Sequence, residues 1–450
     1  MCRWDLLNES KAKKLLEFAL SNSKAEQTQV VLYVKDLATT RFAKNYIHQN
    51  VSGYEVRLWV KAVSGRKTGV ASTNNLGDKS ILDTLESAAE LARLQSDSPY
   101  QVSLPGPAPI KKARGFVSKT AGYTPEQRAK DVGVICSRSR ENGLEASGAF
   151  STGTIQIVIA NSLGLLASHK STLAEITSVV LGDSSSGYAE HCTPDVGEID
   201  MEAVAAEAVD KAVRSKDPVA LEPGEYEVIL EDHAVGDILS FMGYLGFSAQ
   251  AVQEGRSFVT GKAGQKVLPE SISIWDDGMG RGTVPVPFDY EGFPKKKVEF
   301  IVNGVAKDVC YDSYTAAKDG KTSTGHASLA GEGMGPVPMN MFLKTGKATL
   351  QDMIASTQKG LWITRFHYTR TVHPLKVIVT GMTRDGTFLV EKGEVRRPVK
   401  NLRFTQSYID ALNGVQMIGK TARLRDSEMA YNVAPALKLA RFNFTGATEF

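Results

Sequence analysis

The same order of helical and strand-like segments occurs twice in the first half of this chain, and this repetition constrains the fold most. In each block, a segment with apolar residues at helical spacing is followed by strand-like runs and then by a second helical segment. The order is compatible with an internal duplication, although hairpin turns favour Asn, Ser and Gly in unrelated sequences as well. The four helical segments are residues 8–21, 80–92, 125–141 and 198–214.

Turn signals divide the strand-like runs and predict four antiparallel strands in each block. In the first block these signals are Asp36, Ser52-Gly53 and Ser64-Gly65. The predicted strands are residues 29–34, 41–49, 55–62 and 67–73 in the first block and residues 144–149, 153–160, 165–181 and 186–192 in the second.

A domain boundary is predicted at residues 215–224, where Pro and Gly surround a polar segment and a new apolar strand follows. Beyond a helix at about residues 233–244, the chain is rich in Gly, in strand-like runs and in Asn-Gly and Asp-Gly turn dipeptides. We therefore predict an α+β fold with two N-terminal α/β modules and a C-terminal, mostly antiparallel β domain or barrel. The predicted domains are residues 1–104, 105–218 and 219–450.

The composition indicates an ordinary globular protein and excludes several classes of partner. With 42% hydrophobic and 23% charged residues and a net charge of +3, the chain has no charge field that would attract nucleic acid or a membrane. The lysine triplet that begins at Lys295 is expected to be a solvated turn. The four cysteines are widely spaced, and neither a signal peptide nor a membrane-spanning apolar stretch is visible. We therefore predict a cytoplasmic location.

Several short motifs follow one another between Pro223 and the C-terminus. They are Pro223-Gly-Glu-Tyr-Glu-Val-Ile-Leu230, Ala234-Val-Gly236, Asp276-Asp277-Gly278, Asp289-Tyr-Glu-Gly292, Val302-Asn-Gly304, Tyr311-Asp312 and Ser323-Thr-Gly325. In this order and spacing the chain resembles the TldD/PmbA family, a peptidase-related group once labelled modulators of DNA gyrase. The N-terminal blocks match that family chiefly in architecture and length.

The resemblance also implies a branch of the family. In the metal-bearing TldD branch, the helix that opens the last domain carries HExxxH, which resembles a zinc site with Glu as general base, and a further ligand is a Cys near the C-terminus. Here the matching positions hold Asp232, His233 and Asp237, and no cysteine follows Cys310. The resemblance therefore implies a PmbA/TldE-like subunit, which pairs with a TldD-like subunit in a dimeric peptidase.

The expected function is that of the non-metal subunit of a dimeric metallopeptidase that degrades or processes unfolded peptides. We expect no cofactor in this chain, zinc in the partner subunit, and contacts to small or unfolded peptides mainly through the backbone, by strand addition. One alternative is a self-sufficient homodimeric hydrolase with an altered metal site at Asp232, His233 and Asp237. A second alternative is a regulatory binding protein that modulates DNA gyrase.

His233 is the candidate catalytic residue. If the helix begins at His233, then His233 and Asp237 lie on one face and, with Asp232 and a histidine further along the chain, could form a metal site. We favour a simpler interpretation, in which Asp232 caps the helix, Asp237 interacts with its positive N-terminal end, and His233 is a partly exposed side chain.

His326, Trp362 and His367 are candidate substrate-binding residues. His326 follows Ser-Thr-Gly in a glycine-rich loop, where a solvated histidine is the favoured alternative. Trp362 and His367 lie in an aromatic segment that would form either a peptide-binding wall or, as we favour, an interior strand with a subunit contact. The sequence contains no serine-hydrolase elbow and no phosphate-binding loop. It therefore does not predict a serine nucleophile or ATP-driven chemistry.

Overall fold

The computed structural model describes residues 8–100, 103–329, 335–427 and 430–448. Within these residues, the N-terminal half forms one antiparallel sheet with the strand order β3-β2-β1-β4-β5-β6. β1 and β4 pair along their length at the centre, so the two predicted modules share a single sheet. The strands are β1 (Gln27–Ala43), β2 (Tyr46–Ser64), β3 (Lys67–Thr73), β4 (Glu145–Asn161), β5 (Leu166–Leu181) and β6 (Ser186–Thr193).

Each block contributes three strands to this sheet, so the prediction of four strands in each block is wrong. Asp36 and Gly53, which were expected to mark turns, lie in the middle of the β1–β2 ladder, where Asp36 pairs with Tyr54 and Gly53 with Leu37. β4 pairs with the other edge of β1 over the same stretch. Pairing with neighbouring strands therefore overrides the local turn preference of these residues.

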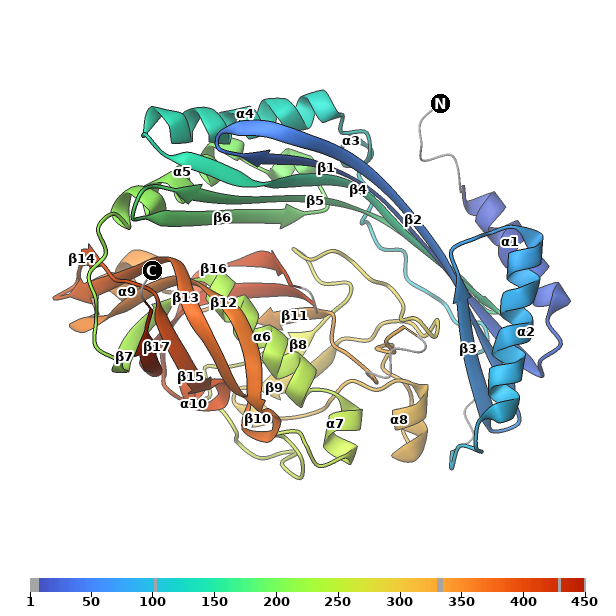
Figure 1. The fold of residues 1–450 in the computed structure, drawn as a ribbon. Coiled ribbons are helices and arrows are strands. Elements are labelled where there is room, and N and C mark those ends of the chain that lie inside the picture. The colour runs from blue at the N-terminus through green and yellow to red at the C-terminus, as the bar shows by residue number, and fades with distance from the viewer. Residues whose placement is uncertain (1–7, 101–102, 330–334, 428–429, 449–450) are drawn as a thin grey trace.

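The long helices cover the face of the sheet that is turned away from the rest of the molecule (Figure 1). α1 and α2 pack on one end of the sheet, and α4 and α5 pack on the other. All four helices predicted from the sequence are confirmed. They are α1 (Glu9–Asn22), α2 (Asp78–Leu94), α4 (Pro125–Glu141) and α5 (Met201–Arg214), and the shorter elements between them are α3 (Ser118–Ala121) and η2 (Val196–Glu198).

A glycine on each outer strand lets a helix approach the sheet closely. A Cβ atom at Gly69 in β3 would lie 2.2 Å from the carbonyl oxygen of Ala88 in α2. A Cβ atom at Gly187 in β6 would lie 2.1 Å from the carbonyl oxygen of Ala208 in α5. The two blocks therefore pack their second helix on their last strand in the same way.

Gly187→Ala is expected to lower the free energy of unfolding by about 1–3 kcal/mol, because the atoms in its way belong to a helix backbone that cannot move aside alone. Gly133→Ala in α4 is the control, since its Cβ would have no atom within 4 Å. That substitution should leave stability unchanged or raise it by up to about 1 kcal/mol. Urea unfolding followed by circular dichroism measures both, and equal effects would contradict the close approach.

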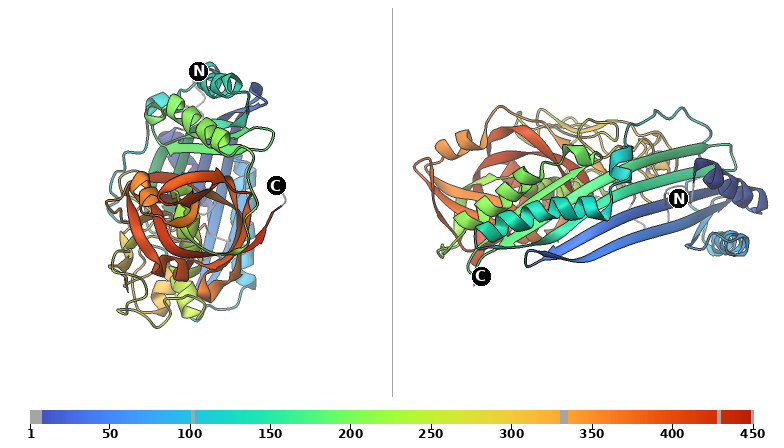
Figure 2. Two further views of the ribbon diagram at one scale, coloured as in Figure 1. Left: turned by 90° about the vertical axis from the view of Figure 1, so that its left-hand side faces the viewer. Right: turned by 90° about the horizontal axis from the view of Figure 1, so that it is seen from above.

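The C-terminal half forms a second, mostly antiparallel sheet, part of which closes into a ring (Figure 2, left). β7 pairs with both β12 and β17, so the path β17-β15-β13-β12-β7 returns to β17. This confirms the predicted α+β fold. The strands are β7 (Gly224–Leu230), β8 (Ile274–Asp276), β9 (Val298–Val302), β10 (Val305–Ala306), β11 (Asn340–Leu343), β12 (Lys359–His373), β13 (Ile378–Glu391), β14 (Glu394–Pro398), β15 (Leu402–Ser407), β16 (Val415–Asp426) and β17 (Tyr431–Ala447).

Helix α6 packs against β12 and β17 of this ring and is buried on nearly all sides. Its apolar residues Val235, Ile238 and Met242 belong to the main core of the domain. A helix that is apolar all round is stable only in such surroundings. The helices of this half are α6 (Asp232–Gly246), α7 (Ala249–Gln253), α8 (Ser313–Lys318), α9 (Leu350–Ala355), η3 (Pro374–Lys376) and α10 (Tyr408–Asn413).

The N-terminal sheet arches over the C-terminal domain (Figure 1). Val31 of β1 and Ile159 of β4 pack against Phe288, which lies in a loop of the C-terminal domain. Further along the same face, Leu173 packs in a second cluster with Leu424. No helix in the described part of the chain is long and apolar enough to cross a membrane.

Candidate functional site

A groove of about 940 Å³ lies between the end of the N-terminal sheet and the C-terminal domain. Residues 190–193 of β6 line one side, and residues 422–425 of β16 line the other. Among the described residues, β6 pairs with β5 alone, and residues 422–425 of β16 pair with β17 alone, because the bridge of β16 to Ala348 lies before them at Gly419. Strands at the edge of a sheet present N–H and C=O groups that no neighbouring strand uses. The groove is therefore suited to an extended polypeptide.

Asp232, at the start of α6, forms a buried ion pair with Arg425, which lines the groove. Arg425 Nη2 donates to Asp232 Oδ2 at 2.9 Å, and Nη1 donates to the carbonyl oxygen of Glu190 at 2.8 Å. Burial alone would lower the pKa of Arg425, but the Asp232 and Glu190 carboxylates outweigh it and raise that pKa. Asp232 is not the helix cap, because Glu231 holds that position.

His233 is enclosed, and the expectation of a partly exposed side chain is wrong. Its side chain is only 6% exposed, with Nδ1 3.7 Å from Glu190 Oε2. The imidazole ring stands edge-on to the Tyr188 ring, with 5.0 Å between the two ring centroids. Its Nε2 atom is buried without a hydrogen-bond partner. Burial, reinforced by the charge of Arg425, lowers the pKa of His233 well below its ordinary value, so the imidazole is neutral.

Asp237 is half-buried at the edge of the domain core. Its carboxylate accepts hydrogen bonds from the hydroxyls of Thr369 at 2.7 Å and Tyr408 at 2.6 Å. Burial raises the pKa of Asp237 to about 6. Asp232 and Asp237 are thus held by different partners and do not form a common set of ligands.

These three positions do not fit the zinc site that the metal-bearing branch implies. An arginine cation contacts Asp232, and two hydroxyl donors satisfy Asp237. Nowhere in the described ranges do three or more His, Cys, Asp or Glu side chains form a group that could hold a metal ion. A cation of the protein itself therefore balances the charge of Asp232.

Asp237→Asn is expected to change how stability depends on pH. The folded-state pKa of about 6 lies above the ordinary value of 3.8, so the folded chain keeps a proton that the unfolded chain releases. The stability from this group is full below about pH 4 and is lost as the pH rises to about 6. Between about pH 4 and pH 7, the variant should gain on the order of 2 kcal/mol relative to the native chain.

Urea unfolding at a series of pH values measures this difference in the free energy of unfolding. Asp410→Asn, at an exposed position of α10, is the control and should run parallel to the native chain. If Asp237→Asn also runs parallel to the native chain, the Asp237 carboxyl does not retain its proton.

The three candidate substrate-binding residues lie in different surroundings. Trp362 is buried in a small core cluster, and its indole N–H donates to Glu231 Oε1 at 2.7 Å. His367, further along β12, is half-buried, and burial together with Arg384 lowers its pKa. Neither Trp362 nor His367 is among the described residues that line the groove. His326 lines a separate, smaller cavity.

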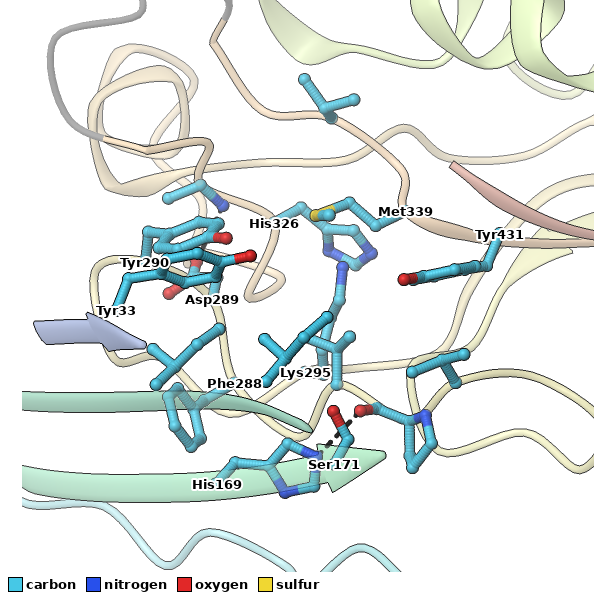
Figure 3. A pocket seen from close by; sticks show the side chains of 17 residues that line it. Tyr33, His169, Ser171, Phe288, Asp289, Tyr290, Lys295, His326, Met339 and Tyr431 are labelled. Atoms are coloured by element: carbon cyan, nitrogen blue, oxygen red, sulfur yellow. Dashed lines mark hydrogen bonds between the residues drawn. The ribbon is translucent and has the colours of Figure 1, made fainter. Parts of the chain in front are cut away.

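This smaller cavity, of about 140 Å³, lies between the N-terminal sheet and loops of the C-terminal domain (Figure 3). His326 is 1% exposed, so the expectation of a solvated histidine is wrong. Its Nε2 atom lies 2.9 Å from Asp276 Oδ1. The Lys295 side chain, also expected to be solvated, is only 2% exposed. No local sequence pattern marks these two side chains as buried, because they meet Asp276 only when a loop, β8 and the long segment before β9 fold together.

Comparisons with known proteins agree on one family. The description "PmbA/TldA metallopeptidase" applies to all three matched domains: domain 1 at residues 31–92, the central domain at residues 125–216 and the C-terminal domain at residues 223–446. The chain is 22% identical to the metalloprotease PmbA of Escherichia coli O157:H7, over 96% of both chains. It is 24% identical to the metalloprotease TldD homolog of Haemophilus influenzae, over 81% of this chain and 79% of that one.

The fold also matches solved structures. TldE from Thermococcus kodakarensis superposes with a TM-score of 0.87 at 19% identity, covering 97% of this chain and all of that one. At this identity the match shows the fold, while the three domain matches and their order show the family. The chain therefore belongs to the TldD/PmbA family of metallopeptidase-related proteins.

Proposed function

We propose that this chain is the non-metal, PmbA/TldE-like subunit of a dimeric peptidase that degrades or processes unfolded peptides. The observation that carries the proposal is the ion pair between Arg425 and Asp232. It places a cation of the protein at a position that corresponds to a metal ligand in the TldD branch, while Asp237 is bound by Tyr408 and Thr369. Zinc and the general base then belong to a TldD-like partner with an intact HExxxH motif.

The groove between β6 and β16 would help to hold the peptide. Strand addition along an edge strand gives affinity through main-chain hydrogen bonds and demands little of the peptide sequence. The groove carries both signs of charge, with Arg114 and Arg281 exposed and Glu198 and Glu207 along the same lining. Mixed charge of this kind suits a broad range of peptides. The likeness in fold to the TldE of Thermococcus kodakarensis supports the same branch.

Reconstitution tests the proposal. This chain, a TldD-like chain from the same genome and their mixture would each be incubated with an unfolded protein such as reduced, alkylated casein. Only the mixture should release peptides at a high rate. Replacing the motif Glu of the partner with Gln should abolish the activity, whereas His233→Ala in this chain should leave most of it. Activity of this chain alone, lost in His233→Ala, would support the self-sufficient hydrolase instead.

Metal analysis separates the same two functions without an activity assay. Plasma mass spectrometry of the dialysed native chain and of His233→Ala should find no stoichiometric metal in either. Near-stoichiometric zinc or iron that disappears in the variant would overturn the non-metal assignment. The role at DNA gyrase stays a prediction, and a supercoiling assay with the purified chain would test it.

A further inference from the structure

The cavity that contains His326 has a mostly apolar lining and a size that fits a small ligand. Ile155 and Ile157 of β4 contribute from the N-terminal sheet. Phe288 and Met339 contribute from the C-terminal domain (Figure 3). Its volume of about 140 Å³ is close to that of an apolar cavity of about 150 Å³ that binds benzene. The space therefore suits a compact apolar group.

One charged group in this cavity lacks hydrogen-bond partners. Lys295 Nζ lies 3.7 Å from Asp276 Oδ1, which is too far for a hydrogen bond, although the lysine side chain is only 2% exposed. Both oxygens of Asp276 already have partners, His326 Nε2 at 2.9 Å and the Asn340 N–H at 2.7 Å. Within the described chain, the ammonium thus makes no hydrogen bond. A buried ammonium has three donors to satisfy.

Tyrosine hydroxyls approach the same space. In Figure 3 the hydroxyl of Tyr431 points toward Lys295 and His326 from one side, and that of Tyr33 points inward from the other. Neither hydroxyl hydrogen-bonds to a described residue. His326 differs, because its two ring nitrogens face Asp276 and Thr324. The free donors that face the cavity are therefore an ammonium and neutral hydroxyls.

We propose that this cavity binds a small monocarboxylate with an apolar body about the size of a benzene ring, with the carboxylate on Lys295 and Tyr431. A carboxylate accepts several hydrogen bonds from an ammonium and hydroxyls, and such charge-assisted bonds are short and strong. Asp276 already balances part of the single charge of Lys295, at 3.7 Å, so the site matches one negative charge better than the two charges of a phosphate group.

The carboxylate has two chemical sources, a free acid or the C-terminal residue of a peptide. Pro285 lines both this cavity and the large groove between β6 and β16, so the two spaces adjoin. A peptide in the groove could place its last apolar side chain and its terminal carboxylate in the cavity. The peptide source rests on the proposed peptidase function, whereas the binding of a free acid does not.

Ligand titration of the purified full-length chain tests the site. Benzoate is the probe, benzamide is its uncharged counterpart, and acetate lacks the apolar body. Isothermal titration calorimetry should show saturable binding of benzoate that is about tenfold or more tighter than that of either analogue. Lys295→Met should weaken benzoate binding to a similar extent. Lys297→Met, a neighbouring lysine that is 48% exposed, should leave it unchanged.

Several outcomes would overturn the proposal: no saturable binding of benzoate, equal binding of benzoate and benzamide, or unchanged binding in Lys295→Met. Should Lys295→Met fail to fold, Tyr431→Phe together with the comparison of benzoate and benzamide still decides the question.

A short peptide that ends in Phe, with either a free carboxylate or an amide, identifies the source. If only the peptide with a free carboxylate competes with benzoate, the site binds peptide C-termini. If neither peptide competes, the site binds small free acids. This assay uses the isolated chain, so a failure to reconstitute peptidase activity would not affect it.

Discussion

Arg425→Met is expected to lower the free energy of unfolding by about 3–5 kcal/mol, one of the two largest effects of a single substitution that we predict. The guanidinium group is 4% exposed and holds Asp232 at 2.9 Å and the carbonyl oxygen of Glu190 at 2.8 Å. Methionine fills much of the same space but leaves both groups buried without their donor. The expected loss of stability comes from leaving buried polar groups without hydrogen-bond partners. This free-energy cost exceeds the net stabilisation that the ion pair provides.

Two further variants separate charge from packing. Arg425→Met combined with Asp232→Asn removes the unpaired charge of Asp232 and should recover part of the lost free energy of unfolding. The effects of the two substitutions should therefore be non-additive. Arg423→Met is the control, because Arg423 is 55% exposed, lies 3.8 Å from the same carboxylate and should cost less than about 1 kcal/mol. Equal costs for the two arginines would show that Arg425 does not hold Asp232 in place. Urea unfolding of the native chain, the three single variants Arg425→Met, Asp232→Asn and Arg423→Met, and the double variant measures these effects.

The sequence predicted the helices well because their signal is local. Helical spacing of apolar residues located all four N-terminal helices and α6. The strands were divided wrongly because Asp36 and Gly53 favour turns in isolation, whereas two neighbouring strands fix them in a ladder. Local preference is a weak guide wherever pairing supplies the hydrogen bonds.

The candidate site was only partly predictable for the same reason. The family motifs drew attention to Asp232, His233 and Asp237, but the residue that determines the chemistry of Asp232 is Arg425, which lies 193 positions away. Nothing in the sequence near Arg425 distinguishes it from the exposed Arg423 two residues before it. Likewise, Lys295 stands in a triplet that resembles a solvated turn, and only the packing of the C-terminal loops against the N-terminal sheet buries it.

Lys211→Met should be similarly destabilising, by about 3–5 kcal/mol, and it tests how the two halves of the molecule are joined. Lys211 lies on α5 and is 5% exposed, and its ammonium contacts Glu231 at 2.7 Å and Glu207 at 2.9 Å. Glu231 precedes α6 and also accepts the indole N–H of Trp362 on β12. Without the lysine, the Glu231 carboxylate at the start of α6 would be buried with the Trp362 N–H as its single hydrogen-bond donor.

Matched variants show whether the unpaired Glu231 carboxylate causes the loss of stability in Lys211→Met. Lys211→Met combined with Glu231→Gln should recover part of the stability, because glutamine is uncharged and its oxygen still accepts the Trp362 N–H. Arg214→Met on the same helix is the control, since the Arg214 side chain is 51% exposed beside Asp210 and should cost less than about 1 kcal/mol. No recovery in the double variant would mean that Lys211 acts through packing of its aliphatic chain and that Glu231 needs no cation.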